Sequence, residues 1–106
     1  MFDALEMSLQ FLERLVPIEN RIRQRSASLA KQLANASESI ALNLGEGRLR
    51  RAGDKRHYFE IAAGSASEAT TALRIAVAKR YISATEFAAI DAVLDRVRAM
   101  LFRLTL

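Results

Sequence analysis

The sequence has no cysteine and no tryptophan, and it has only one proline and four glycines. Without thiols the chain can form no disulfide, thiolate metal site or cysteine nucleophile, which is typical of proteins of the reducing cytoplasm. Charged residues interrupt every apolar stretch well before the ~18–20 residues that a bilayer span needs, and Asp3 and Glu6 stand where a secretory signal would be basic. We therefore expect a cytoplasmic protein that does not span a membrane.

The length and the apolar spacing predict one all-α domain. The 106 residues are enough for one hydrophobic core but not for two ordinary domains, so residues 1–106 are expected to form a single domain. Apolar residues recur at intervals of three and four, and no segment alternates as a β-strand does. The prediction is an antiparallel up-and-down four-helix bundle with helices near 2–16, 18–46, 54–82 and 84–104.

Local signals place the helix boundaries. Pro17 is interpreted as the end of the first helix, and Gly45 or Gly47 as the C-cap of the second. Ser83 and Glu86 have the spacing of a capping box, which predicts the start of the last helix. That helix has a bundle seam with steps of three and four residues: Phe87, Ile90, Leu94, Val97, Leu101 and Leu104.

The first predicted helix carries two apolar stripes about 130° apart around its axis. One stripe consists of Phe2, Leu5, Leu9, Leu12 and Val16, and the other of Ala4, Met7, Phe11 and Leu15. A bundle helix buries one face, so one stripe needs another partner. We interpret Met7, Phe11 and Leu15 as the surplus and predict that they join the subunits of a homo-oligomer.

A sequence pattern on the second and third predicted helices resembles a known family. Its residues are Gln32, Leu33, Ala36, Ser39, Ile40, Asn43, Leu44, Gly45, Glu46 and Gly47, followed by Ile61, Ala62, Ala63, Gly64, Ser65 and Glu68. This pattern resembles the four-helix-bundle proteins encoded in intervening sequences of bacterial 23S rRNA genes, and it is similar to the accessory protein of diversity-generating retroelements. The resemblance implies the bundle fold and a homo-oligomer, a pentameric ring. Ala34 and Asn35 replace the arginine pair usual in the family, which weakens a nucleic-acid role at that point.

Part of this pattern is a set of polar residues that we expect to fix the register of the second and third helices: Ser39, Asn43, Glu46, Ser65 and Glu68. Asn43 lies three residues beyond Ile40 on the inward side, so it is predicted to be buried and hydrogen-bonded between the two helices. Direct contact with a ligand is the alternative. Gly64, beside Ser65, is expected to form a notch for close packing.

No set of residues with catalytic or metal-binding spacing was found. His57 is the only histidine, and the single Asp54-x-x-His57 pair falls short of the ligand set that a di-iron bundle requires. Gly45-Glu46-Gly47 follows a helix and lacks the lysine of a phosphate-binding loop. We therefore expect no enzyme activity, no metal and no cofactor.

The positive charge is concentrated in one predicted loop, residues 48–56. The loop contains one acid and five bases, Arg48, Arg50, Arg51, Lys55 and Arg56, so the rest of the chain carries 11 charges of each sign. A second cluster, Arg21, Arg23 and Arg25, should share the other end of the bundle with Arg74, Lys79 and Arg80. Both clusters predict contacts with the phosphates of structured RNA or an RNA–DNA hybrid, made by a non-catalytic oligomeric accessory protein. The alternatives are a solvated loop, or a scaffold that docks an acidic protein partner such as a polymerase-like enzyme.

Overall fold

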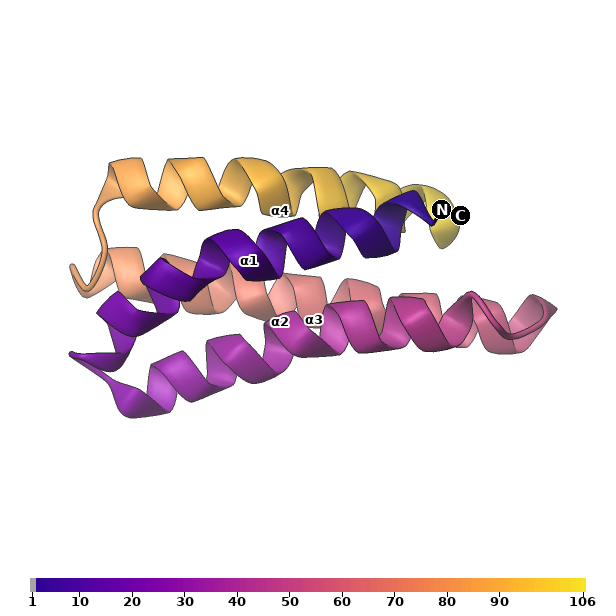
Figure 1. Ribbon diagram of the computed structural model, residues 1–106, viewed down its shortest axis with the longest axis horizontal. Helices are drawn as coiled ribbons and strands as arrows, with labels where there is room; N and C mark the ends of the chain where they lie inside the picture. Colours follow the sequence, from indigo (N-terminus) through magenta and orange to yellow (C-terminus); the bar gives the residue numbers. More distant parts are fainter. Residues whose placement is uncertain (1) are drawn as a thin grey trace.

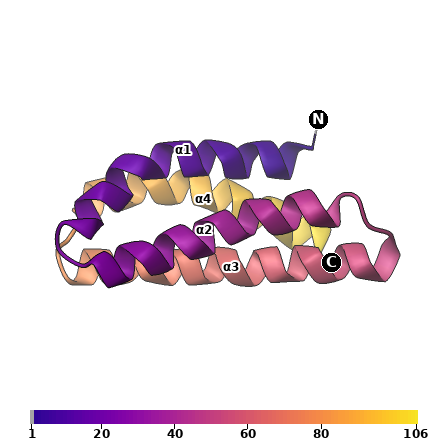
Figure 2. The same cartoon turned by 60° about the horizontal axis from the view of Figure 1, so that its bottom comes forward.

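The computed structural model describes residues 2–106 as four α-helices (Figure 1). They are α1 (Asp3–Arg23), α2 (Ala27–Gly47), α3 (Ala52–Ala78) and α4 (Ala84–Leu104). α1 and α3 each pack against both α2 and α4, and consecutive helices run in opposite directions (Figure 2). No strand occurs within residues 2–106. The predicted all-α, antiparallel up-and-down bundle is confirmed.

The core is built mainly from large side chains of α1, α2 and α4, while α3 contributes mostly small ones besides Phe59 and Leu73. Its largest fully buried apolar residues are Phe11, Leu15, Ile22, Leu33, Ile40, Leu44, Leu73, Leu94, Val97 and Leu101. α3 contributes chiefly alanines, among them Ala62, Ala66, Ala69 and Ala76. The predicted α4 seam is buried from Ile90 to Leu101, and Ser83 and Glu86 form the capping box at its start.

The predicted boundary between the first two helices is wrong. α1 continues through Pro17 to Arg23, and α2 begins after Ser26, whose hydroxyl accepts a hydrogen bond from the Leu29 amide. A proline inside a helix costs about 3 kcal/mol. Continuing the helix, however, buries Ile18 and Ile22, and each such side chain contributes about 1.5–3 kcal/mol. Core packing therefore outweighs the local penalty.

The stripe of α1 that was predicted to be surplus is in fact the core stripe. Phe11 and Leu15 have no exposed surface, and Met7 is 8% exposed. Ile18 and Ile22 extend this stripe into the last turns of α1, so it is the longer of the two and packs into the bundle. The interface prediction for Met7, Phe11 and Leu15 is therefore wrong, and the other stripe leaves Leu9 46% and Val16 53% exposed.

The glycines play other roles than those predicted. Gly45 and Gly47 both lie inside α2, whose C-cap is Arg48 with an ordinary helical φ of −62°. A Cβ added at Gly47 would lie 2.8 Å from Cε1 of Phe59, so Gly47 permits the close approach of α3. The notch predicted at Gly64 is wrong, because this residue is exposed and open space lies beside it.

The α2–α3 hairpin gives the molecule its elongated shape. The principal extents are 42 × 22 × 20 Å, and the connection between α2 and α3 projects beyond both chain ends (Figures 1 and 2). The α1–α2 and α3–α4 connections lie at the opposite end. Within residues 2–106 no helix is both long and apolar enough to cross a membrane.

Candidate nucleic-acid interface

The projecting hairpin carries the basic segment predicted from the sequence, which we call the basic tip (residues 48–56). α2 ends at Gly47 and α3 begins at Ala52, so the tip comprises the short connection and the first turn of α3. All four of its arginines are exposed, and Lys55 is half-buried. Cationic side chains therefore surround the end of the hairpin on an element that stands clear of the bundle.

Two of the tip arginines are held by the protein itself. Arg50 Nη2 lies 2.6 Å from Glu46 Oε1, and this hydrogen bond raises the pKa of the arginine, while its guanidinium lies 5.3 Å from the centre of the Tyr58 ring. Arg56 pairs with Glu60 at 2.8 Å and donates to the carbonyl oxygens of Thr105 and Leu106, each at 2.9 Å. These contacts direct Arg50 and Arg56 toward protein groups.

The other three cations of the tip keep their charge uncompensated. Among residues 2–106, Arg48, Arg51 and Lys55 form no ion pair and donate no side-chain hydrogen bond. Arginine forks and lysine ammonium groups of this kind bind phosphates well when nothing else engages them. These three residues are therefore the strongest candidates of the tip for contact with an anion.

The second predicted cluster lies at the opposite end, which we call the closed end (residues 17–26 and 79–86). There Arg21 pairs with Glu86 at 2.9 Å, and Arg23 pairs with Glu19 at 3.8 Å. Hydrogen bonds from the Ser83 backbone, and secondarily Arg21, lower the pKa of Glu86. Arg25 has no carboxylate partner within residues 2–106 and lies 5.4 Å from the centre of the Tyr81 ring. The two clusters thus lie far apart, at the two ends of the long axis.

The polar residues of the family pattern are only partly brought together. Ser39 and Ser65 share a hydrogen bond of 2.7 Å between α2 and α3. Asn43 is half-buried and donates to the carbonyl and hydroxyl oxygens of Ser39, so the predicted direct bond from Asn43 to the third helix is wrong. Because these partners lie one turn away on α2, Ser39 makes the connection to α3. Glu46 pairs instead with Arg50, and Glu68 is exposed.

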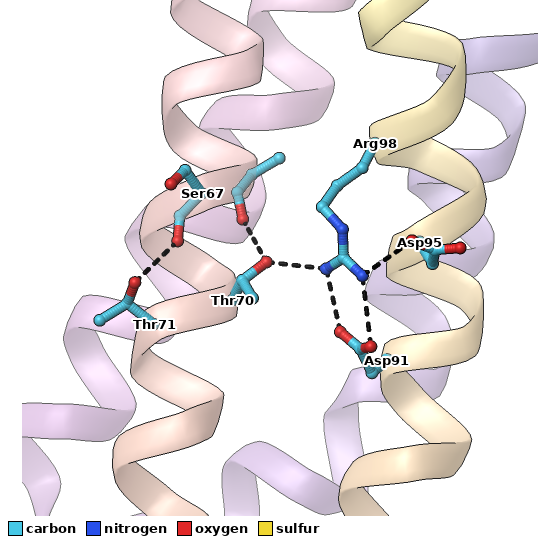
Figure 3. Close-up of polar contacts among 7 residues, drawn as sticks. Ser67, Thr70, Thr71, Asp91, Asp95 and Arg98 are labelled. Carbon is cyan, nitrogen blue, oxygen red and sulfur yellow. Dashed lines mark hydrogen bonds and ion pairs between the residues drawn. The ribbon is translucent and has the colours of Figure 1, made fainter.

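One polar network between α3 and α4 was not predicted (Figure 3). Arg98 donates to Asp91 at 2.9 and 3.2 Å, to Asp95 at 3.1 Å and to Thr70 of α3 at 2.8 Å. Partial burial lowers the pKa of Arg98, but the hydrogen bonds with the two carboxylates outweigh it and the pKa is raised. Asp95 and Asp91 lie three and seven residues before Arg98, on the same face of α4, and this spacing could have indicated the ion pairs, but not the contact with Thr70. With two carboxylates and one guanidinium, this network repels anions.

No catalytic or metal-binding arrangement appears in the part of the chain that the structure describes. His57 and Asp54 are both exposed on the first turns of α3. Within residues 2–106, no three side chains of histidine, cysteine, aspartate or glutamate come together as metal ligands could. The cationic side chains that cluster are those of the basic tip and the closed end.

Comparisons with known proteins agree with the fold and with the resemblance seen in the sequence. None of the curated proteins matches this chain. It is similar to the crystal structure of a protein of unknown function from the S23 ribosomal protein family of Bacteroides thetaiotaomicron, with a TM-score of 0.89 and 21% identity over 96% of this chain and 97% of that one. The model of the 23S rRNA-intervening sequence protein family matches residues 2–103. Because this match spans nearly the whole bundle, the chain belongs to the 23S rRNA-intervening sequence protein family.

Proposed function

We propose that this protein is a non-catalytic, homo-oligomeric accessory protein that binds structured RNA, or an RNA–DNA hybrid, through phosphates at the basic tip. One observation carries the proposal: the tip projects from the bundle, and Arg48, Arg51 and Lys55 on it have no carboxylate partner among residues 2–106. Contacts of this kind bind phosphates independently of base sequence. Several subunits would repeat the tip around one assembly, so weak contacts add by multivalency.

The outer surface of α1 and α2 supports the oligomer. The outer row of α1 consists of Leu5, Leu9, Leu12, Val16 and Glu19, which share one face of the helix. Burial is the main cause of the raised pKa of Glu19; Arg23 opposes the rise, and the negative charge of Glu38 on α2 adds to it. This row therefore borders α2. Glu38 in turn shares a row with the small residues Ala34, Ala41 and Gly45. Leu9 and Val16 are the exposed apolar side chains of this row. Beside a row of small residues they suit a second copy of the chain, and the family resemblance suggests five.

The test of RNA binding uses Arg48→Gln/Arg51→Gln/Lys55→Gln. Its control, Arg14→Gln/Arg74→Gln/Arg96→Gln, removes the same charge from exposed positions outside the tip. Affinity for a structured RNA is measured at several salt concentrations. The tip variant should bind more weakly and lower the slope of log affinity against log salt by up to about 3, since each lost phosphate contact removes about one unit. Equal effects of the two triple variants, at unchanged helix content, would refute a specific role of the tip.

A second candidate, docking of an acidic protein, is favoured by Leu49. This leucine is 74% exposed among the arginines of the tip, and an apolar side chain contributes to a protein interface but not to phosphate binding. Leu49→Ser should therefore leave RNA affinity unchanged. If the wild-type protein does not bind RNA in a salt-dependent manner, the tip is better explained by an acidic partner.

The oligomer is tested separately with Leu9→Glu/Val16→Glu, which places two charges on the outer row of α1. Sedimentation should show a shift toward folded monomer. The matched control is Ile61→Glu/Ile75→Glu on α3, where both side chains are 39% exposed, and it should leave the assembly intact. A wild-type protein that sediments as a monomer at micromolar concentration would refute the assembly.

A further inference from the structure

A hollow of about 500 Å³ lies at the closed end of the bundle. It is lined by Pro17, Asn20, Arg21, Gln24, Arg25 and Tyr81. The last turns of α1 and the turn after them supply five of these residues, and the α3–α4 connection supplies Tyr81. The tertiary fold therefore builds the hollow from two segments that are distant in sequence, at the end opposite the basic tip (Figure 1).

The polar groups that line the hollow are predominantly hydrogen-bond donors. Asn20 Oδ1 accepts from Arg23 Nη1 at 2.8 Å, so the free group of Asn20 is its amide N–H₂. Arg21 uses Nη1 to bind Glu86, which leaves its Nε and Nη2 donors. Gln24 and Tyr81 contribute an amide and a phenolic hydroxyl. None of the described residues that line the hollow is a carboxylate.

The surrounding charge also favours an anion. The closed end carries five cationic side chains against two carboxylates, Glu19 and Glu86, which leaves a net charge of +3. Two of the C-terminal carbonyl groups of α1, which would repel an anion, accept hydrogen bonds: Asn20 O accepts from the Gln24 amide, and Ile22 O from the Arg25 and Ser26 amides. The Tyr81 ring holds the Arg25 guanidinium 5.4 Å from its centre, at the wall of the hollow.

We propose that this hollow binds a phosphomonoester, either at the 5′ end of an RNA or on a free nucleotide. Arg25 supplies a guanidinium with no carboxylate partner within residues 2–106, and Arg21 keeps two donors beside its pair with Glu86. With the net charge of +3, these donors suit the nearly two negative charges of a phosphomonoester better than the single charge of a phosphodiester. The hollow is open to solvent, since all its lining residues except Tyr81 are exposed, and this leaves it accessible to a terminal phosphate. The proposal rests on the proposed RNA function for the first ligand source only, since a free nucleotide requires no contact at the basic tip.

The test compares three probes on the full chain: a short RNA with a 5′-phosphate, the same RNA with a 5′-hydroxyl, and adenosine monophosphate. Wild-type protein should bind the 5′-phosphorylated RNA about tenfold more tightly than the 5′-hydroxyl RNA, as expected for one charge-assisted bidentate contact. Arg25→Gln should abolish this preference. Arg96→Gln, an exposed arginine on α4, is the matched control and should keep it.

A second variant, Tyr81→Leu, keeps both arginines but removes the ring that positions Arg25, and it should reduce the preference. Thermal unfolding followed by circular dichroism verifies that each variant is folded. Loss of the preference in Arg25→Gln supports the site. The ligand is assigned in the basic-tip triple variant, where RNA no longer binds through the tip: tighter binding of the 5′-phosphorylated RNA than of adenosine monophosphate assigns the site to RNA ends, and equal binding assigns it to nucleotides. Wild-type protein that neither prefers the 5′-phosphate nor binds adenosine monophosphate, or a preference that survives Arg25→Gln, would overturn the proposal. The basic-tip triple variant leaves the hollow intact, so binding of adenosine monophosphate to it separates this site from the proposed function of the tip.

Discussion

Replacing Gly47 by alanine should destabilise the hairpin at the base of the basic tip. The added Cβ would lie 2.8 and 2.9 Å from two ring carbons of Phe59 and 3.0 Å from Cβ of Tyr58, well inside the ~3.5–4.0 Å at which carbon atoms attract. The Phe59 ring is buried and packs 5.8 Å from the Phe2 ring, which restricts its movement. Overpacking of this kind typically costs about 1–3 kcal/mol.

The helix preference of alanine offsets only part of this cost. In a helix interior alanine is favoured over glycine by about 0.5–1 kcal/mol, and Gly47 is the last residue of α2, where the gain is smaller. We expect a net loss of about 1–2 kcal/mol in the free energy of unfolding, which corresponds to a fall in Tm of about 5–15 °C for a domain of this size. The measurement is urea and thermal unfolding, with the helix content followed by far-ultraviolet circular dichroism.

The matched control is Gly64→Ala in the middle of α3. Gly64 is exposed, and apart from its chain neighbours and the backbone of its own helix no atom of residues 2–106 lies within 4 Å of an added Cβ, so the same substitution should stabilise the protein by about 0.5–1 kcal/mol. The two variants therefore test one chemical change with opposite expected signs. If Gly47→Ala is as stable as Gly64→Ala, the approach of α2 and α3 is not limited by Gly47, and the reasoning fails.

Three further predictions concern the core, the α3–α4 network and a helix cap. Phe11→Ala should lower the free energy of unfolding by about 3–5 kcal/mol, because Phe11 is fully buried. A variant as stable as the wild type in chemical unfolding would contradict its place in the core. Arg98→Met should cost about 1–2 kcal/mol by removing hydrogen bonds to Asp91, Asp95 and Thr70, and a neutral result in the same assay would show that the network adds nothing. Because the pKa of Glu86 is lowered in the folded protein, its carboxylate stabilises the fold fully above the ordinary glutamate pKa, and this stabilisation is lost as the pH falls through the lowered pKa. Glu86→Gln should therefore lose less stability than the wild type when the pH is lowered through this range, as measured by unfolding at a series of pH values.

Local signals determined those helices whose boundaries depend on nearby residues alone. The start of α4 followed from Ser83 and Glu86, because a capping box satisfies backbone amides within one turn. The α4 seam followed from its spacing, since that helix has only one apolar face. The sequence likewise located the basic tip, because charges on a short connection between long helices must lie at one end of the bundle.

Where two local signals conflicted, packing decided. Pro17 marks a break in the sequence, yet burial of Ile18 and Ile22 carries α1 past it. The two stripes of α1 are nearly equivalent in the sequence, and only the positions of α2 and α4 select the stripe of Phe11 for the core. Periodicity shows that residues share a helix face, but it does not show which face meets another helix.

The candidate sites follow the same division. The sequence supplied the list of cations, but only the structure showed which of them form ion pairs. Arg50 pairs with Glu46 and Arg56 with Glu60, whereas Arg48 and Arg51 have no carboxylate partner within residues 2–106. The hollow at the closed end could not be predicted at all. It exists because the α3–α4 connection brings Tyr81 against Arg25, and a contact between residues so far apart in the chain depends on how the helices pack, not on any local pattern.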